Sequence, residues 1–174
     1  MTAGNLKKRY IGRTDESLCP EGIVLLESYI QKNIYPEVQR VYVSPMKRCM
    51  ETAKLIFKEN FYEVEELREC DFGIFENKNY KELSDCPEYQ AWIDSGGTLA
   101  FPGGESREAF IARCVDGMEL VMEQIRQQLA YRACPKCRET EDNCMIQEPL
   151  PVAAVVHGGT IMALLSHTSA TALS

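Results

Sequence analysis

Two apolar patterns follow one another along the chain. In the first, apolar side chains recur every three or four residues, as in Ile23, Leu26 and Ile30, which is the spacing of an amphipathic helix. In the second, short β-branched runs such as residues 41–43 indicate buried strands. Helices are predicted over residues 20–33, 45–58, 105–132 and from 159 onward, and strands over 41–43, 62–67 and 152–156. Strands that alternate with helices predict an α/β sheet.

Polar segments rich in glycine and proline separate these elements. The first twenty residues contain Gly4, Gly12 and Pro20 as breakers, so we expect an extended loop there. Residues 70–104 carry aromatic side chains and two glycine pairs, and we expect a long loop with one short helix over about residues 80–93. Loops of this length in a compact domain are usually functional.

The clearest candidate site is His157, in the sequence VVHGGT after the last predicted strand. Ligands of α/β sheets bind at the carboxyl ends of strands, and the N-terminus of the following helix favours anions. Glycine beside the histidine lets a ligand approach the backbone. The pattern indicates a phosphate or other oxyanion beside His157, and a hydrogen-bonded core histidine after a tight turn is an alternative of equal weight.

Two other strand ends add a cation and a carboxylate. Ser44 and Pro45 are expected to start a helix whose first turn contains Arg48. A cation is unfavourable at this end of the helix dipole, so Arg48 indicates an anion nearby, although a solvated surface arginine is the commoner case. Glu69 would serve as a general acid if it were partly buried, because burial raises a carboxyl pKa. By composition alone it does not differ from acidic neighbours such as Glu66.

Composition narrows the class of protein. The 174 residues, 45% of them apolar, suit one globular domain with a core. The net charge of −7 argues against a nucleic-acid partner, yet a few arginines can hold a phosphate in an acidic protein. No stretch is long and apolar enough to span a membrane, and the N-terminal residues have no signal-peptide pattern. We therefore expect a cytoplasmic protein without membrane contact, cofactor or catalytic metal.

The chain contains eight cysteines. Without a secretion signal, a disulfide framework is not expected. Cys49 and Cys114 fall on apolar helix faces and are predicted to be buried thiols. Cys134, Cys137 and Cys144 include a Cys-x-x-Cys pair, which is a common zinc half-site, but a fourth ligand is lacking. A polar surface excursion explains this cluster more simply.

Five segments, in this order, resemble the histidine phosphatase superfamily, which includes phosphoglycerate mutases and α-ribazole phosphatases. The first segment matches the N-terminal motif of that family from the position after its Arg-His-Gly. The matching segments are residues 1–22, Ser44-x-x-x-Arg48-x-x-x-Thr52-Ala53, Leu67-x-Glu69-x-x-Phe72-Gly73-x-x-Glu76, Gly103-Gly104-Glu105-Ser106 and His157-Gly158-Gly159. They span nearly the whole chain.

The resemblance implies a phosphoglycerate-mutase-like α/β fold, a three-layer sandwich of a mostly parallel sheet with helices on both faces. It implies phosphoryl transfer in two steps through a phosphohistidine, with arginines and a second histidine stabilising the equatorial oxygens. Arg48 would then be one phosphate clamp, His157 the second histidine, and Glu69 the acid and base. The residues that would contact the substrate are Asn5, Gly12, Arg48 and Gly158.

The resemblance also implies missing parts. The nucleophilic histidine and the first strand of the family would precede Met1, and the C-terminus is shorter than usual in the family. We therefore expect a single domain over residues 1–174, truncated at the N-terminus and at the C-terminus. His167 lies outside every matched motif and is interpreted as incidental. A sheet without a central strand exposes unpaired backbone, so we expect low stability or self-association into a homo-oligomer.

The expected function is that of a phosphomonoester phosphatase acting through a phosphohistidine on a small phosphorylated metabolite, in a chain that lacks the nucleophile. Two alternatives stay open. One is a non-catalytic relative that binds a phosphorylated ligand, or inorganic phosphate, through Arg48 and His157. The other is a phosphoglycerate mutase, although the compact length favours the α-ribazole or generic phosphatase branch. Residues 74–104, where substrate contacts are expected, do not identify a ligand.

Overall fold

The computed structural model describes residues 1–58, 60–133 and 151–171. These residues form a parallel sheet of three strands in the order β2-β1-β3. The strands are β1 (Arg40–Val43), β2 (Phe61–Glu63) and β3 (Val152–Val155). All three strands run in the same direction, so their carboxyl ends lie along one edge of the sheet, as the sequence pattern predicted.

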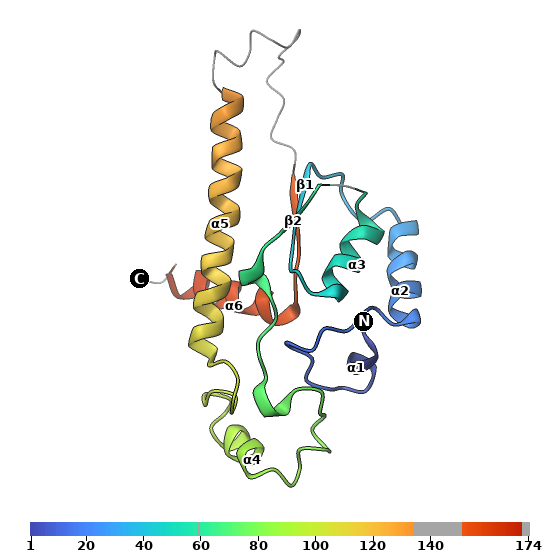
Figure 1. Cartoon of the computed structure of the whole chain (residues 1–174). Helices are drawn as coiled ribbons and strands as arrows, with labels where there is room; N and C mark the ends of the chain where they lie inside the picture. The colour runs from blue at the N-terminus through green and yellow to red at the C-terminus, as the bar shows by residue number, and fades with distance from the viewer. Residues whose placement is uncertain (59, 134–150, 172–174) are drawn as a thin grey trace.

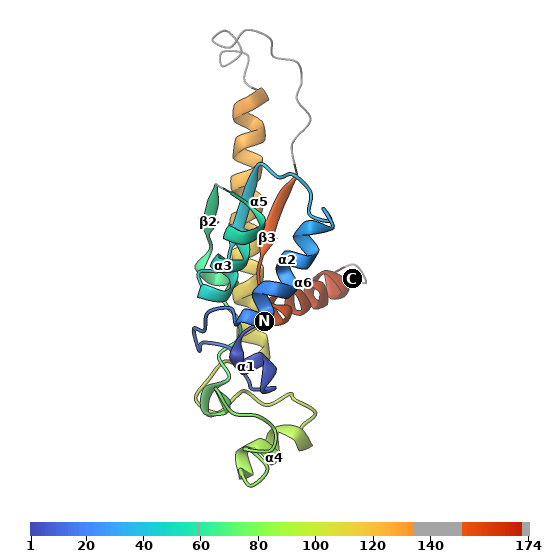
Figure 2. The same cartoon turned by 90° about the vertical axis from the view of Figure 1, so that its right-hand side faces the viewer.

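Helices cover both faces of this sheet. In Figures 1 and 2, α2 and α3 lie on one side, and the long helix α5, with α6 packed against it, lies on the other. The bounds of these helices are α2 Pro20–Gln31, α3 Lys47–Ile56, α5 Arg107–Ala133 and α6 Gly158–Thr171. The predicted three-layer α/β arrangement is confirmed.

Alternating side chains of β1 attach the two helical layers to the sheet. Val41 and Val43 are buried on one face, where they pack with Cys49 of α3. Tyr42 between them points to the other face and packs with Val121 of α5. Burial on both faces explains why the run reads as continuously apolar.

Burial of Cys49 and Cys114 is also confirmed. The cluster of Cys134, Cys137 and Cys144, predicted to be a polar surface excursion with a zinc half-site as the alternative, lies outside the described residues. Within the described part of the chain, no three His, Cys, Asp or Glu side chains gather as metal ligands would. No described helix has the length and apolar character needed to cross a membrane.

The predicted strand over residues 62–67 is only half right. β2 ends at Glu63, and the 3₁₀ helix η1 (Glu65–Leu67) replaces the rest. Val64 and Leu67 are both buried against Val121, so the chain turns toward α5 instead of continuing along the sheet. Tertiary packing thus overrides the local strand propensity.

The predictions for the two loops also need correction. The first twenty residues contain a short helix, α1 (Ala3–Leu6), which a capping box between Thr2 and Asn5 stabilises. In the long loop, the 3₁₀ helix η2 (Gly73–Phe75) comes first, and the predicted helix starts later than expected, as α4 (Pro87–Asp94). Pro87 favours the first position of a helix because it has no N–H to satisfy there.

Candidate functional site

The predicted site residues meet where β1 and β3 end. Val43 and Val155 are paired in the sheet, so the residues that follow them emerge side by side. The hydroxyl of Ser44 lies 2.8 Å from Nε2 of His157, and Nε of Arg48 donates a hydrogen bond of 3.2 Å to Nδ1 of the same ring. Two residues that the sequence placed at separate strand ends, Arg48 and His157, are thus in direct contact.

These contacts define the protonation state of His157. The side chain is 6% exposed, and because Arg48 can only donate, Nδ1 must be unprotonated. The ring hydrogen therefore lies on Nε2 and is donated to the Ser44 hydroxyl. Burial, together with the charges of Arg48 and Arg113, lowers the pKa of His157 from 6.5 to about 3. His157 is therefore a neutral imidazole with both nitrogens engaged.

We predict that His157 does not titrate between pH 5 and 8. Below pH 6.5 the unfolded chain binds a proton that the folded chain does not, because the folded pKa lies near 3. The free energy of unfolding should therefore fall as the pH drops from 6.5 toward 3. An NMR titration of the His157 ring checks this, with the protein unfolded in urea as the control. A midpoint near 6.5 in the folded protein would contradict the geometry.

Ser44 does not start the following helix as predicted. The N-cap residue of α3 is Met46, and its side chain makes no capping hydrogen bond. The carboxylate of Asp15 instead accepts the backbone N–H of Lys47 at 2.7 Å. The Ser44 hydroxyl is turned toward His157, which explains why Asp15 caps this helix.

Arg48 lies in the first turn of α3, as predicted, and within the described part of the chain it is not bonded to any carboxylate. The side chain is 9% exposed, and besides His157 it donates only to backbone carbonyls, at Ile11, Gly12 and Thr14, over 2.9 to 3.4 Å. All these acceptors are neutral, and no ion pair includes Arg48 among the described residues. A nearly buried guanidinium that is not directly bonded to a carboxylate is costly, and an anionic ligand would offset that cost.

We call residues 11–14 the strap, because they cross the site and supply these carbonyls. The amide groups of Gly12, Arg13 and Thr14 donate to the carboxylate of Glu76 over 2.9 to 3.3 Å, and the Thr14 hydroxyl adds a bond of 2.6 Å. A Cβ at Gly12 would overlap the backbone oxygen of Cys70. Gly12 is thus needed for close packing, besides being a predicted contact residue.

Glu69 reaches the site from the segment after η1. Its carboxylate accepts the backbone N–H of Gly159, at the start of α6, over 3.3 Å and that of Cys70 over 3.0 Å. A Cβ at Gly159 would overlap this carboxylate, so the glycine permits the approach. Burial raises the pKa of Glu69 above 4.5, against the lowering effect of these hydrogen bonds and of Arg48. A carboxyl group with a raised pKa suits proton donation.

Arg113 of α5 holds the backbone that carries Glu69. It pairs bidentately with Glu105, with both N–O distances 2.8 Å, and donates to the carbonyls of Glu66, Arg68 and Glu69 over 2.7 to 3.4 Å. A planar guanidinium can serve both acceptor sets at once. Glu105 belongs to the fourth matched segment, but the sequence pattern gave no reason to pair it with Arg113.

The remaining predicted contact residues have different surroundings. The side-chain oxygen of Asn5 accepts from the backbone and hydroxyl of Thr2, so its described role is to cap α1. Gly158 borders open space, since a Cβ there would have no atom within 4 Å. Gly158 therefore leaves room for a ligand at the start of α6.

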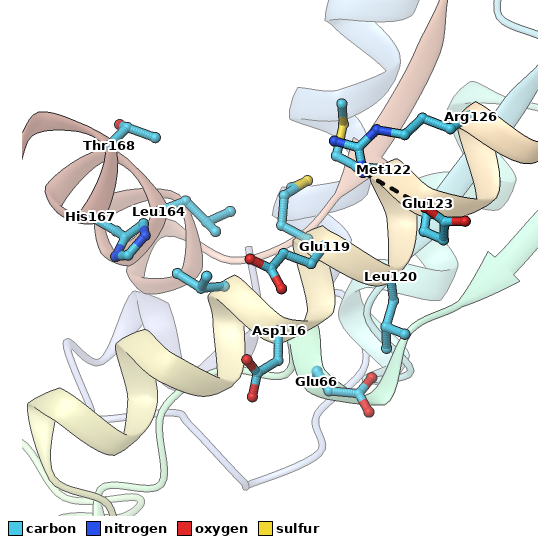
Figure 3. A pocket seen from close by; sticks show the side chains of 12 residues that line it. Glu66, Asp116, Glu119, Leu120, Met122, Glu123, Arg126, Leu164, His167 and Thr168 are labelled. Carbon is cyan, nitrogen blue, oxygen red and sulfur yellow. Dashed lines mark ion pairs between the residues drawn. The ribbon is translucent and has the colours of Figure 1, made fainter. Parts of the chain in front are cut away.

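A separate hollow of about 850 Å³ lies between α5 and α6 (Figure 3). It contains no residue of the Arg48–His157 site, although His167 lines it. Its carboxylates come from Glu66, Asp116, Glu119 and Glu123. Its one arginine is already paired with a glutamate over 3.7 Å. The negatively charged lining repels phosphate. The large volume of this hollow is therefore no indication of a phosphate-binding site.

Comparisons with known proteins bear on the family and the fold of the chain. The chain matches, over residues 1–174, the family model of the histidine phosphatase superfamily (branch 1). A phosphoglycerate mutase from Thermus thermophilus is 25% identical with a TM-score of 0.63, covering 95% of this chain and 78% of that one. No curated protein sequence matches the chain significantly.

Two further solved structures share the fold. A protein of Escherichia coli K-12, provisionally described as an α-ribazole-5'-P phosphatase, is 20% identical with a TM-score of 0.71, covering 95% of this chain and 73% of that one. YhfR of Bacillus stearothermophilus is 19% identical with a TM-score of 0.73, covering 97% of this chain and 75% of that one.

Proposed function

Because the chain belongs to the histidine phosphatase superfamily (branch 1), we propose that it binds the phosphate group of a small phosphomonoester at Arg48 and His157. The observation that carries this proposal is the Arg48 guanidinium, which is 9% exposed and has only neutral acceptors. A phosphate oxygen would supply the missing negative charge in surroundings where water screens it little.

Glu69 would act as the proton donor of the site. Burial raises its pKa, so a larger fraction of this carboxyl group is protonated near neutral pH than in an exposed glutamate. When the phosphorus–oxygen bond of a phosphomonoester breaks, the proton of Glu69 would pass to the oxygen of the leaving alcohol. Its hydrogen bond to Gly159 keeps the carboxylate at the start of α6, which directly follows His157 in the chain.

His157 is poorly arranged to be the nucleophile. Its Nδ1 lone pair accepts from Arg48, and its Nε2 carries the hydrogen donated to Ser44, so neither nitrogen has a free electron pair. The sequence has one other histidine, His167, which lines the acidic hollow instead of this site. The described residues therefore supply the phosphate clamp and the acid, and a phosphohistidine step would need a further histidine.

Hydrolysis of p-nitrophenyl phosphate and titration with inorganic phosphate test the proposal. The 174-residue chain should bind phosphate saturably without measurable turnover at pH 5.5 and 7.5. Turnover that disappears in the His157→Ala variant would overturn the assignment and make His157 the attacking group. A chain that neither binds nor hydrolyses would refute the phosphate site itself.

A phosphoglycerate mutase is the second candidate, and the similarity to the Thermus mutase favours it. A mutase and a phosphatase share the clamp and differ in whether water or a second hydroxyl accepts the phosphoryl group. If turnover is found, formation of phosphoglycerate isomers without release of inorganic phosphate would favour the mutase.

A further inference from the structure

The strap lies between two side chains of opposite charge, Glu76 and Arg48. Its amide groups face the Glu76 carboxylate, and its carbonyl groups face the Arg48 guanidinium. Peptide dipoles oriented in this way are stabilised at both ends, with the N–H groups toward the anion and the oxygens toward the cation. Glu76 and Arg48 therefore act on the same short run of peptide groups without touching each other.

Both oxygens of Glu76 are used in this arrangement. Oε1 accepts the backbone N–H groups of Arg13 and Phe72, over 2.9 and 3.1 Å. Oε2 accepts the backbone N–H groups of Gly12 and Thr14, each over 3.3 Å, and the Thr14 hydroxyl. Every group facing Glu76 is a donor, so a glutamine would bring its NH₂ group against donors on one side.

We propose that Glu76 is a positioning residue of the phosphate site, which acts through the strap to fix the Arg48 guanidinium against His157. The chain of contacts runs from the Glu76 carboxylate to the strap amides, and from the strap carbonyls to Arg48. Arg48 in turn meets Nδ1 of His157 over 3.2 Å. The functional part of this inference rests on the proposed phosphate site, whereas the geometric part does not.

Fixing Arg48 in this way matters because an arginine side chain has many rotamers. Three strap carbonyls orient its Nη1 and Nη2 atoms, and His157 orients Nε. A guanidinium held in place loses less conformational freedom when it takes up an anion. The strap carbonyls carry no net charge, so they orient the cation without neutralising it.

The test compares Glu76→Gln with Glu82→Gln as a matched control. Glu82 is an exposed carboxylate that pairs with Arg9 over 2.7 Å, and its hydrogen bonds among the described residues go to Arg9 and Asn79, not to the strap. Thr14→Val is a second variant, which removes only the 2.6 Å hydroxyl bond to Glu76 and serves if Glu76→Gln does not fold. We expect Glu76→Gln to weaken binding of inorganic phosphate about tenfold, the lower end of what loss of an outer partner costs at metal sites, and Thr14→Val to weaken it less.

A second readout separates positioning from a general structural role. The ¹⁵N signals of the His157 ring report which nitrogen carries the hydrogen. Glu76→Gln should shift them toward a mixture of tautomers, because Arg48 no longer holds Nδ1. In the Arg48→Lys background, the Glu76→Gln change should have little further effect on phosphate affinity, since both act through one guanidinium.

Each outcome decides one of the two ideas. If Glu76→Gln matches Glu82→Gln in phosphate affinity and in the His157 signals, the positioning role is refuted. The second case is that the His157 signals move in Glu76→Gln, but neither the unmodified chain nor any variant binds phosphate. The positioning role then stands and the proposed function fails. Additive effects of Glu76→Gln and Arg48→Lys would also refute a shared path through Arg48.

Discussion

Replacing Gly12 with alanine is expected to lower the free energy of unfolding by about 3 kcal/mol, the upper range for an overpacked site. The new Cβ would overlap the carbonyl oxygen of Cys70 and crowd a carboxylate oxygen of Glu76, so backbone must move on one side or the other. Such a movement separates the strap from both Glu76 and Arg48. Urea denaturation followed by circular dichroism measures the change.

Gly158→Ala is the matched control for this prediction. A Cβ at Gly158 has no atom within 4 Å, and the residue starts α6, so the same chemical change should alter stability by less than about 0.5 kcal/mol. If Gly12→Ala is equally mild, the strap can adjust freely, and its close packing in the structure does not constrain the site.

Replacing Arg48 with alanine is expected to affect both stability and phosphate affinity. Three backbone carbonyls and the Nδ1 atom of His157 would lose their donor, and the free energy of unfolding should fall by about 2 to 3 kcal/mol. Affinity for inorganic phosphate should fall at least about a hundredfold, because the guanidinium in contact with His157 is gone. Calorimetric titration with phosphate and urea denaturation measure the two effects.

Arg48→Lys separates charge from geometry in this experiment. Lysine retains the positive charge but has no planar fork to serve the strap carbonyls and His157 together. We expect Arg48→Lys to recover part of the phosphate affinity and little of the stability. A lysine variant equal to the unmodified chain in both would mean that a positive charge near His157 is sufficient.

The sequence predicted the parts of this site that depend on strand ends. Short apolar runs followed by Ser44 and by His157 located two carboxyl ends of one parallel sheet, and the structure confirms that they meet. The prediction that the second run is buried was wrong, because β3 lies at the edge of the described sheet and its residues are exposed or half-buried. The position of Arg48 in the first turn of a helix was also readable, because the helix pattern starts just before it. These signals are local, so a single sequence contains them.

The sequence did not predict the groups that hold these residues in place. Glu76 binds backbone amides more than 60 residues away, as in its bond to Gly12 at a separation of 64 residues. Backbone N–H and C=O groups are the same in every residue, so no pattern of side chains marks them as partners. The end of β2 at Glu63 was missed for a related reason, since burial of Leu67 against Val121 depends on where α5 lies.

The hydrogen bonds of the site have a consequence for folding. Arg48 is hydrogen-bonded to Gly12, 36 positions before it, and to His157, 109 positions after it. Contacts between such distant residues form late in folding, because the long chain segment between them must first lose its conformational freedom. The site therefore forms only when the domain as a whole has folded. An anion bound at Arg48 would consequently stabilise the entire domain by mass action, and not only the loop that touches it.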